Sequence, residues 1–173
     1  MKEFEVSKVS TSDADLLQII AKQTFYETFK DQNSEEDMNQ YLNENFSSQK
    51  IINELNTLNS EFYFATLNCK IVGYLKINFG NSQTELSNKN GLEIERIYVL
   101  NQFHGKNVGQ ILFDKVLEIA LKHKNDFVWL GVWEKNPRAI NFYKKNGFVA
   151  FDKHIFQLGN DKQTDIMMKL IVK

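Results

Sequence analysis

The alternation of apolar and polar positions predicts a chain that begins with one strand and three helices. Phe4, Val6 and, less regularly, Val9 alternate with polar residues, which favours a strand. Apolar residues then recur at helical spacing, and each run follows a serine that can cap a helix. Acidic residues after Ser12 and Ser34 suit the positive end of a helix. The predicted helices span residues 12–30, 34–45 and 49–58.

The remainder of the chain alternates between strand and helix patterns. The predicted strands span residues 61–67, 70–78, 91–99, 127–132, 148–153 and 165–172, and the predicted helices span residues 108–122 and 137–147. The first two strands form a hairpin around Asn68 and Cys69, and residues 79–90 form a polar loop. The alternation slips between Ile94 and Ile97, which predicts a strand bulge. This order of elements predicts one mixed α/β domain over residues 1–173.

Composition narrows the classes of protein without identifying one. The 173 residues carry 21 basic and 22 acidic side chains, which excludes a globally basic nucleic-acid binder. The charges are split: residues 1–100 hold 9 basic and 15 acidic side chains, and residues 101–173 hold 12 and 7. A local site for an anion in the second part stays open.

The sequence favours a cytoplasmic protein without a metal site. No stretch has the roughly 20 apolar residues that span a membrane, and the first residues have no signal-peptide core. The single cysteine, Cys69, cannot form an intramolecular disulfide. The three histidines are scattered and lack the spacing of zinc ligands.

Residues 95–112 contain the strongest chemical signal. A strand ends, a loop with Gly105, Asn107 and Gly109 follows, and an apolar helix begins. Such a turn directs several backbone N–H groups to one point at the positive end of a helix, where an anion can bind. Lys106 adds a cation. The spacing matches neither the Walker pattern nor the dinucleotide pattern, and a plain tight turn fits the residues equally well.

Two motifs make this segment resemble a known family. His-Gly-Lys-Asn-Val-Gly, at residues 104–109, resembles the [QR]-x-x-G-x-[GA] pyrophosphate loop of the GCN5-related N-acetyltransferases, the GNAT family. Residues 136–148 resemble their NxxAxxFYxxxGF segment, so the likeness covers about the last 80 residues. His104 replaces the usual Gln or Arg and Asn107 replaces the central Gly, although Asn tolerates the positive φ of such a turn.

A second likeness narrows the branch within that family. Trp-Leu-Gly-Val-Trp-Glu-Lys-Asn, at residues 129–136, and Phe-Gln-Leu-Gly-Asn-Asp-Lys-Gln-Thr-Asp, at residues 156–165, are similar to the PaiA-like branch. That branch comprises bacterial acetyltransferases associated with polyamines. The resemblance implies a GNAT fold, in which a central, mostly antiparallel seven-stranded sheet is splayed between strands 4 and 5 and flanked by helices.

The resemblance also implies a reaction and its participants. Acetyl-CoA is the expected cosubstrate, without a metal, and the acceptor is a primary amine, in particular a small cationic amine such as a polyamine. Nucleic acid and membrane partners are not expected. Dimers are common in the family, so a homodimer stays open. Two other functions also stay open: a non-catalytic acyl-CoA-binding regulatory module, and an acetyltransferase for proteins or their N-termini.

The same resemblance assigns roles to individual residues. Tyr143 is the expected general acid for the leaving thiolate, with simple packing as the structural alternative. Glu95 is the expected base, acting directly or through water, with Glu134 as a further candidate and an exposed strand glutamate as the alternative. The expected cofactor-binding residues are Ile97, Tyr98, Val99, His104, Gly105, Lys106, Asn107, Val108, Gly109, Gln110, Asn136, Arg138 and Tyr143.

Overall fold

In the computed structural model, which describes residues 4–86, 89–158 and 161–172, seven strands form one sheet. The strand order is β1-β2-β3-β4-β5-β7-β6, and neighbours are antiparallel except for the parallel pair β4 and β5. The strands are β1 (Phe4–Lys8), β2 (Ser60–Leu67), β3 (Lys70–Phe79), β4 (Gly91–Val99), β5 (Phe127–Trp133), β6 (Val149–Leu158) and β7 (Asp161–Ile171). The predicted mixed, mostly antiparallel sheet is confirmed.

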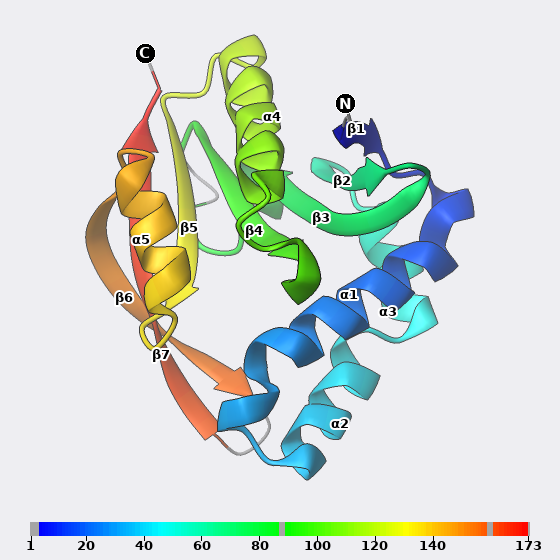
Figure 1. Ribbon diagram of the computed structural model, residues 1–173. Helices are drawn as coiled ribbons and strands as arrows, with labels where there is room; N and C mark the ends of the chain where they lie inside the picture. The colour runs from blue at the N-terminus through cyan, green and yellow to red at the C-terminus, as the bar shows by residue number, and fades with distance from the viewer. Residues whose placement is uncertain (1–3, 87–88, 159–160, 173) are drawn as a thin grey trace.

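Helices cover both faces of this sheet. They are α1 (Ala14–Phe29), α2 (Glu35–Asn45), α3 (Ser48–Leu55), α4 (Val108–Lys122) and α5 (Pro137–Lys145). Figure 1 shows α1, α2 and α3 grouped together at the lower right, α4 at the top centre and α5 at the left beside β5, β6 and β7. Two apolar clusters correspond to these two groups of helices. No helix among the described residues is long and apolar enough to cross a membrane.

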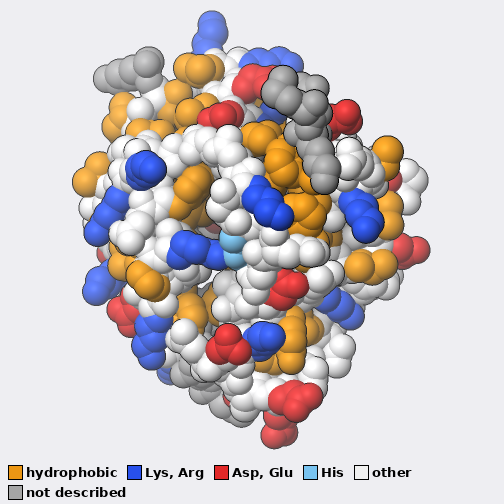
Figure 2. Space-filling model, in the orientation of Figure 1, with side chains coloured by type: hydrophobic (Ala, Val, Ile, Leu, Met, Phe, Trp, Pro, Cys, Tyr) orange, Lys and Arg blue, Asp and Glu red, His pale blue; other side chains and the backbone are white. Residues whose placement is uncertain are grey.

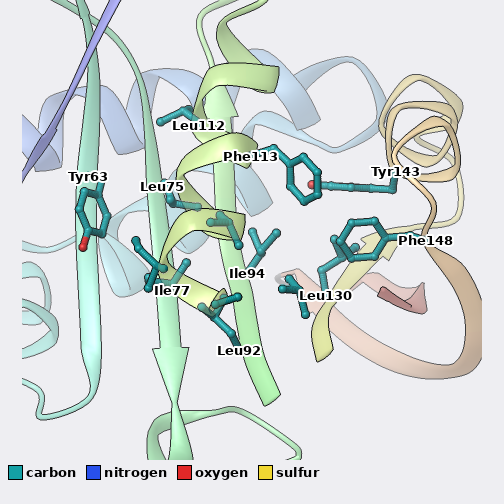
Figure 3. Packing of buried hydrophobic residues seen from close by; sticks show 14 of the residues in the cluster. Tyr63, Leu75, Ile77, Leu92, Ile94, Leu112, Phe113, Leu130, Tyr143 and Phe148 are labelled. Carbon is teal, nitrogen blue, oxygen red and sulfur yellow. The ribbon is translucent and has the colours of Figure 1, made fainter. Parts of the chain in front are cut away.

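The first cluster joins α4 and α5 to the centre of the sheet. Figure 3 shows Leu75, Ile77, Leu92 and Ile94 of the sheet facing Leu112 and Phe113 of α4. Alternate positions on β2 and β3, such as Phe62 and Tyr74, belong to the second cluster with α1, α2 and α3. Because side chains alternate along each strand, the same strands contribute apolar residues to both faces of the sheet.

Serine caps begin the N-terminal helices, but two of them differ from the predicted residues. Ser34 caps α2 as predicted, because its side chain accepts a hydrogen bond from the N–H of Asp37. The predicted cap at Ser12 is wrong: Ser10 and Asp13 form a capping box around a short 3₁₀ turn that precedes α1. Ser47, and not Ser48, caps α3. Each error is within a turn, where neighbouring serines offer the same hydroxyl.

The C-terminal hairpin is longer than predicted. β6 and β7 were expected to span residues 148–153 and 165–172, yet their pairing continues past His154↔Asp165 to Ile155↔Thr164 and beyond. The polar run at residues 152–154 interrupts the apolar alternation of β6, and residues 161–165 of β7 are all polar, so the pattern predicted strand ends there. Pairing between two adjacent arms uses backbone groups, and it continues through both segments.

A bulge and a divergence of strands shape the middle of the sheet. The pairing of β3 with β4 passes from Lys76↔Arg96 to Ile77↔Ile94, which leaves Glu95 as the extra residue and confirms the predicted bulge. β4 and β5 pair only between Gly91↔Phe127 and Glu93↔Trp129. Beyond this point the two strands separate, as Figure 1 shows towards the bottom of the view. The splay predicted between strands 4 and 5 is confirmed.

Candidate active site

Two cavities meet where β4 and β5 separate. One, here called the loop cleft, has a volume of about 530 Å³ and lies against the loop before α4 and the start of that helix. The other, the inner cavity, has a volume of about 400 Å³ and lies between the sheet, α1, α2 and the β6–β7 hairpin. Both are lined by Thr28, Ile97, Tyr98, Asn136, Ala139 and Tyr143. A molecule in the loop cleft can therefore reach one in the inner cavity at these residues.

The loop cleft has a backbone that suits an anion. Gly105 has a φ of +74°, and a Cβ placed on it would meet no atom within 4 Å, so the surface there is open to a ligand. Asn107, directly before α4, has a φ of +66°, which confirms the positive φ expected of it. The first N–H groups of a helix have no partner within the helix and carry its positive dipole. The backbone therefore has the conformation that the predicted anion cradle requires, and anion binding itself stays a prediction.

His104 and Arg138 close one side of this cleft. Nε2 of His104 lies 2.7 Å from the carbonyl oxygen of Val99, and a carbonyl can only accept, so Nε2 carries the hydrogen. The Arg138 guanidinium donates to Nδ1. Burial, followed by the charge of Arg138, lowers the pKa of His104, so the ring is neutral near pH 7. Figure 2 shows basic side chains beside a histidine near the middle of this face.

Most of the predicted cofactor-binding residues line the loop cleft, with one exception. The twelve that do so are Ile97, Tyr98, Val99, His104, Gly105, Asn107, Val108, Gly109, Gln110, Asn136, Arg138 and Tyr143. Lys106 is exposed and does not line the cleft; its Nζ lies 4.9 Å from the centre of the Phe103 ring. Lys145, which was not predicted, lines the cleft from the last turn of α5.

Tyr143 lies at the junction of the two cavities. Asn136 begins its helix, because the Asn136 side chain accepts a hydrogen bond from the N–H of Ala139 at 3.1 Å. The Tyr143 side chain is 7% exposed and packs against Phe142 and Phe148. Figure 3 shows it reaching from α5 into the apolar cluster. Burial raises the pKa of its phenol above the usual value, so the hydroxyl keeps its proton near pH 7.

Glu95, the predicted base, lines the inner cavity but is held in an ion-pair network. Its carboxylate lies 2.7 Å from Nζ of Lys76 and 3.3 Å from the guanidinium of Arg96. Glu54 of α3 binds Arg96 through both carboxylate oxygens, at 2.8 and 2.9 Å. Burial opposes ionisation of Glu95, but Arg96 and Lys76 outweigh it and lower its pKa. A carboxylate with a lowered pKa is a weak proton acceptor.

Glu93, which sequence reasoning missed, lines the same cavity and has the opposite property. It is 4% exposed, and its oxygens accept hydrogen bonds from Asn78 at 3.0 Å and from the Thr84 N–H at 2.8 Å. Burial raises the pKa of its carboxyl, although these hydrogen bonds oppose the rise. On a strand, Glu93 and Glu95 alternate with apolar residues in the same way, so the sequence contained no signal that separates them.

A third group of titratable residues lies on the wall formed by the β6–β7 hairpin. His154 of β6 lies between Glu85, from the loop before β4, and Asp165 of β7. All three line the inner cavity. The sequence did not reveal this group, because it depends on a strand pairing that extends beyond the predicted hairpin.

The N-terminal helices contribute aromatic rings to the lining of the inner cavity. The acidic residues of that lining come from the loop before β4, from β4 and from β7. Phe29 and Tyr41 line the cavity together with Phe25 and Phe46. Glu27 faces away and accepts a hydrogen bond from the N–H of Asn101 at 2.8 Å. Glu134, the other candidate base, is exposed and lines neither cavity.

The residues of the loop cleft fit coenzyme A, and no metal site accompanies them. An anion cradle with basic side chains suits a diphosphate. The unpaired edge of β4 beside Tyr143 suits an amide-containing arm, because strand N–H and C=O groups there have no β5 partner. Among the described residues, no group of three His, Cys, Asp or Glu side chains is placed to hold a metal ion.

The loop cleft, which lies where β4 separates from β5, suits an enzyme that transfers an acyl group from coenzyme A. Comparison of sequences gives the family: the profile of the Acetyltransferase (GNAT) family matches residues 19–148, and the chain belongs to that family. The protein is therefore an acetyl-CoA-dependent N-acetyltransferase, as the resemblance predicted.

The chain is similar in sequence to two relatives and in fold to one solved structure. The chain is 40% identical over 166 residues to an uncharacterised N-acetyltransferase of Lactobacillus delbrueckii subsp. lactis, covering 95% of this chain and 96% of the relative. It is 26% identical over 152 residues to a spermidine N(1)-acetyltransferase of Thermoplasma acidophilum, covering 86% and 89%. The crystal structure of a PaiA N-acetyltransferase of T. acidophilum with coenzyme A superposes with a TM-score of 0.80 at 23% identity, covering 98% and 99%.

Proposed function

We propose that this protein acetylates a small cationic amine, such as a polyamine, by direct attack of the amine on acetyl-CoA. The observation that supports this most is the meeting of the loop cleft and the inner cavity at Tyr143. The amine lies in the inner cavity and the thioester at the junction, so the two reacting groups are brought together without a covalent enzyme intermediate. We further propose that the chain acts as one domain in the cytoplasm.

Tyr143 assists the departure of the thiolate. Its phenol stays protonated because burial raises its pKa. A cysteine-like thiol has a reference pKa of about 8.5, well below that of the buried phenol, so the phenol donates a hydrogen bond to the departing sulfur and keeps its proton. Tyr143, the expected general acid, thus stabilises the leaving thiolate as a hydrogen-bond donor.

The amine must lose a proton before it attacks, because its reference pKa is about 10.4. Glu95 is the base that the family pattern implies, yet Lys76 and Arg96 hold its pKa low. Glu93 lies nearby on the same strand with a raised pKa, which makes it the stronger proton acceptor of the two. We assign the proton to Glu93, and we assign Glu95 to the network that holds Arg96 in place.

The shape and charge of the inner cavity support a small cationic acceptor. Its volume of about 400 Å³ suits a short chain better than a folded protein terminus. Aromatic rings from α1 and α2 offer cation–π contacts, and four carboxylates face it: Glu85, Glu93, Glu95 and Asp165. The spermidine acetyltransferase among the relatives adds support for a polyamine.

The test is a thiol-release assay with purified protein, acetyl-CoA and a panel of amines. The panel contains polyamines, simple monoamines, amino acids, an aminoglycoside and a peptide with a free N-terminus. We expect polyamines to give the highest kcat/KM. A higher kcat/KM with the peptide would instead favour the protein acetyltransferase, and no release with any amine would contradict the proposal.

Tyr143→Phe tests the assigned acid in the same assay. The phenylalanine keeps the ring that packs against Phe142 and Phe148, so folding is preserved. We expect kcat to fall by about 100-fold at pH 7, the usual range for loss of a proton donor, while the affinity for coenzyme A is unchanged. Phe142→Leu is the matched packing control. An unchanged kcat in Tyr143→Phe would remove this residue from the mechanism.

A further inference from the structure

The wall of the inner cavity formed by the β6–β7 hairpin holds a histidine between two carboxylates that the proposed reaction does not use. Nδ1 of His154 lies 2.8 Å from Oε1 of Glu85, and its Nε2 lies 3.4 Å from Oδ2 of Asp165. His154 and Asp165 are paired across the hairpin. The three side chains line the same cavity as Tyr143.

The backbone beneath this group leaves room for it. Gly131 of β5 faces the imidazole, and a Cβ placed on it would come within 2.9 Å of Cε1 of His154 and 3.3 Å of Oδ2 of Asp165. Any other residue at position 131 would displace the ring or the carboxylate. The absence of a side chain in the middle of β5 therefore keeps the wall open at this point.

The group lacks hydrogen-bond donors. Oδ1 of Asp165 is buried and has no hydrogen-bond partner among the described residues, and Nδ1 of His154 also makes no aligned hydrogen bond. A buried acceptor without a donor is unfavourable. Burial raises the pKa of Asp165, as expected for a carboxylate that is short of partners. A ligand with several N–H donors would satisfy this wall.

The charge of the wall depends on His154. A protonated imidazole donates from both nitrogens and can serve both carboxylates, whereas a neutral one has a single N–H. One carboxylate then has no donor, and the three groups carry two negative charges. The other charged residues of the cavity are Glu93, Glu95 and Arg96, and Arg96 is bound to Glu54. The wall is therefore more attractive to a cation when His154 is neutral.

We propose that Glu85, His154 and Asp165 form a second cation site, which binds the distal ammonium of a diamine or longer oligoamine. Protonated His154 occupies the same position and competes with that ammonium. This inference rests on the proposed function, because the first amine of the same molecule is the one acetylated. If the site binds in this way, the preference of the enzyme for diamines over monoamines depends on these three residues and on the pH.

The test compares 1,4-diaminobutane with butylamine between pH 5.5 and 8. The ratio of their kcat/KM values cancels every effect of pH on the shared reaction, because both amines titrate at about pH 10, outside this range. We expect the ratio to rise about tenfold with pH in the wild type. Asp165→Asn should lower the ratio at pH 8 about tenfold, and His154→Gln should make the ratio independent of pH. Asp152→Asn, an exposed acid of β6, is the matched control.

A second measurement needs no turnover. Proton NMR of the histidine Cε1–H signals reports on each ring in the free protein and with each amine at a fixed pH. We expect 1,4-diaminobutane to shift the His154 signal and butylamine to leave it unchanged, with the His123 signal as the internal reference. The competition requires this shift.

The outcomes separate the two proposals. A ratio that is independent of pH and unchanged in Asp165→Asn, together with a His154 NMR signal that 1,4-diaminobutane does not move, would overturn the cation site while butylamine is still acetylated. No thiol release with either amine would contradict the proposed function itself. The NMR titration would still decide whether the diamine binds beside His154.

Discussion

At the scale of single residues, neighbouring acids on β4 have opposite chemical properties. Glu95 is the extra residue of the bulge, and the bulge directs it towards Lys76 and Arg96. Glu93, two residues earlier, is buried with neutral donors only. The residue types are identical, so the difference in pKa comes entirely from the partners that the fold brings to each carboxylate.

This difference predicts two distinct pH profiles. A base works when deprotonated, so kcat/KM falls as pH drops below the pKa of the base, and a raised pKa places that fall above the range of an ordinary glutamate. We expect Glu93→Gln to lose this acid limb and about 100-fold in kcat/KM. Glu95→Gln should keep the limb. Profiles with butylamine measure both, and loss of the limb only in Glu95→Gln would restore Glu95 as the base.

The sequence could predict those site residues whose role depends on local backbone. His104, Gly105, Asn107 and Tyr143 lie in contiguous motifs, and the structure lines the loop cleft with all of them. Glu85, His154 and Asp165 come from three distant segments and meet only through pairing in the sheet. Such a group has no spacing in the sequence that a motif could capture.

At the scale of elements, the start of α4 depends on one unusual backbone conformation. Asn107 has a φ of +66°, which costs most side chains about 1–2 kcal/mol but costs glycine almost nothing. This conformation turns the loop so that the first N–H groups of α4 face the loop cleft. The conformation of Asn107 therefore sets how α4 begins, and through it how well the loop cleft binds an anion.

Substitutions at this position should separate stability from binding. We expect Asn107→Gly to keep the affinity for coenzyme A, and Asn107→Ala to lose about 1 kcal/mol of unfolding free energy and to bind coenzyme A more weakly. Asn68, with a φ of 49° in the β2–β3 turn, supplies the control: Asn68→Ala should lose similar stability without a change in binding. Urea unfolding and calorimetric titration measure both quantities. Equal coenzyme A affinity in Asn107→Ala and the wild type would contradict this role.

Prediction of elements succeeded where apolar periodicity or turn residues were present. The β2–β3 hairpin turns at Asn68 and Cys69, both with positive φ, as expected of that dipeptide. The bulge in β4 followed from the slip between Ile94 and Ile97. The distal half of the β6–β7 hairpin escaped prediction because residues 152–154 interrupt the apolar alternation of β6 and residues 161–165 of β7 are all polar.

At the scale of the whole molecule, the split of charge between the two parts of the chain is only partly explained. Two of the basic residues after residue 100, Arg138 and Lys145, line the loop cleft. The acids of the N-terminal helices do not line the inner cavity, so they do not supply its negative charge. The acids that do line it come from the loop before β4, from β4 itself and from β7.

Binding of coenzyme A should stabilise the whole fold, because the loop cleft joins α4, α5 and β4. A ligand that binds only the native state at 100 times its Kd adds about 2.7 kcal/mol. For a chain of this length, that corresponds to a rise in Tm of about 5–10 °C. Differential scanning fluorimetry with coenzyme A checks this. Adenosine is the control without phosphates, and an equal shift with adenosine would contradict binding through the anion cradle.

The separation of β4 from β5 leaves an internal edge in the middle of an otherwise continuous sheet. Sheet edges are sites where extended chains add by backbone hydrogen bonding, and proteins usually protect them. Here the edge from Ile94 to Val99 has no β5 partner and lines the two cavities, between the helices that pack on either face of the sheet. The fold thus keeps one strand position vacant, and a chain with amide groups can add there by backbone hydrogen bonding.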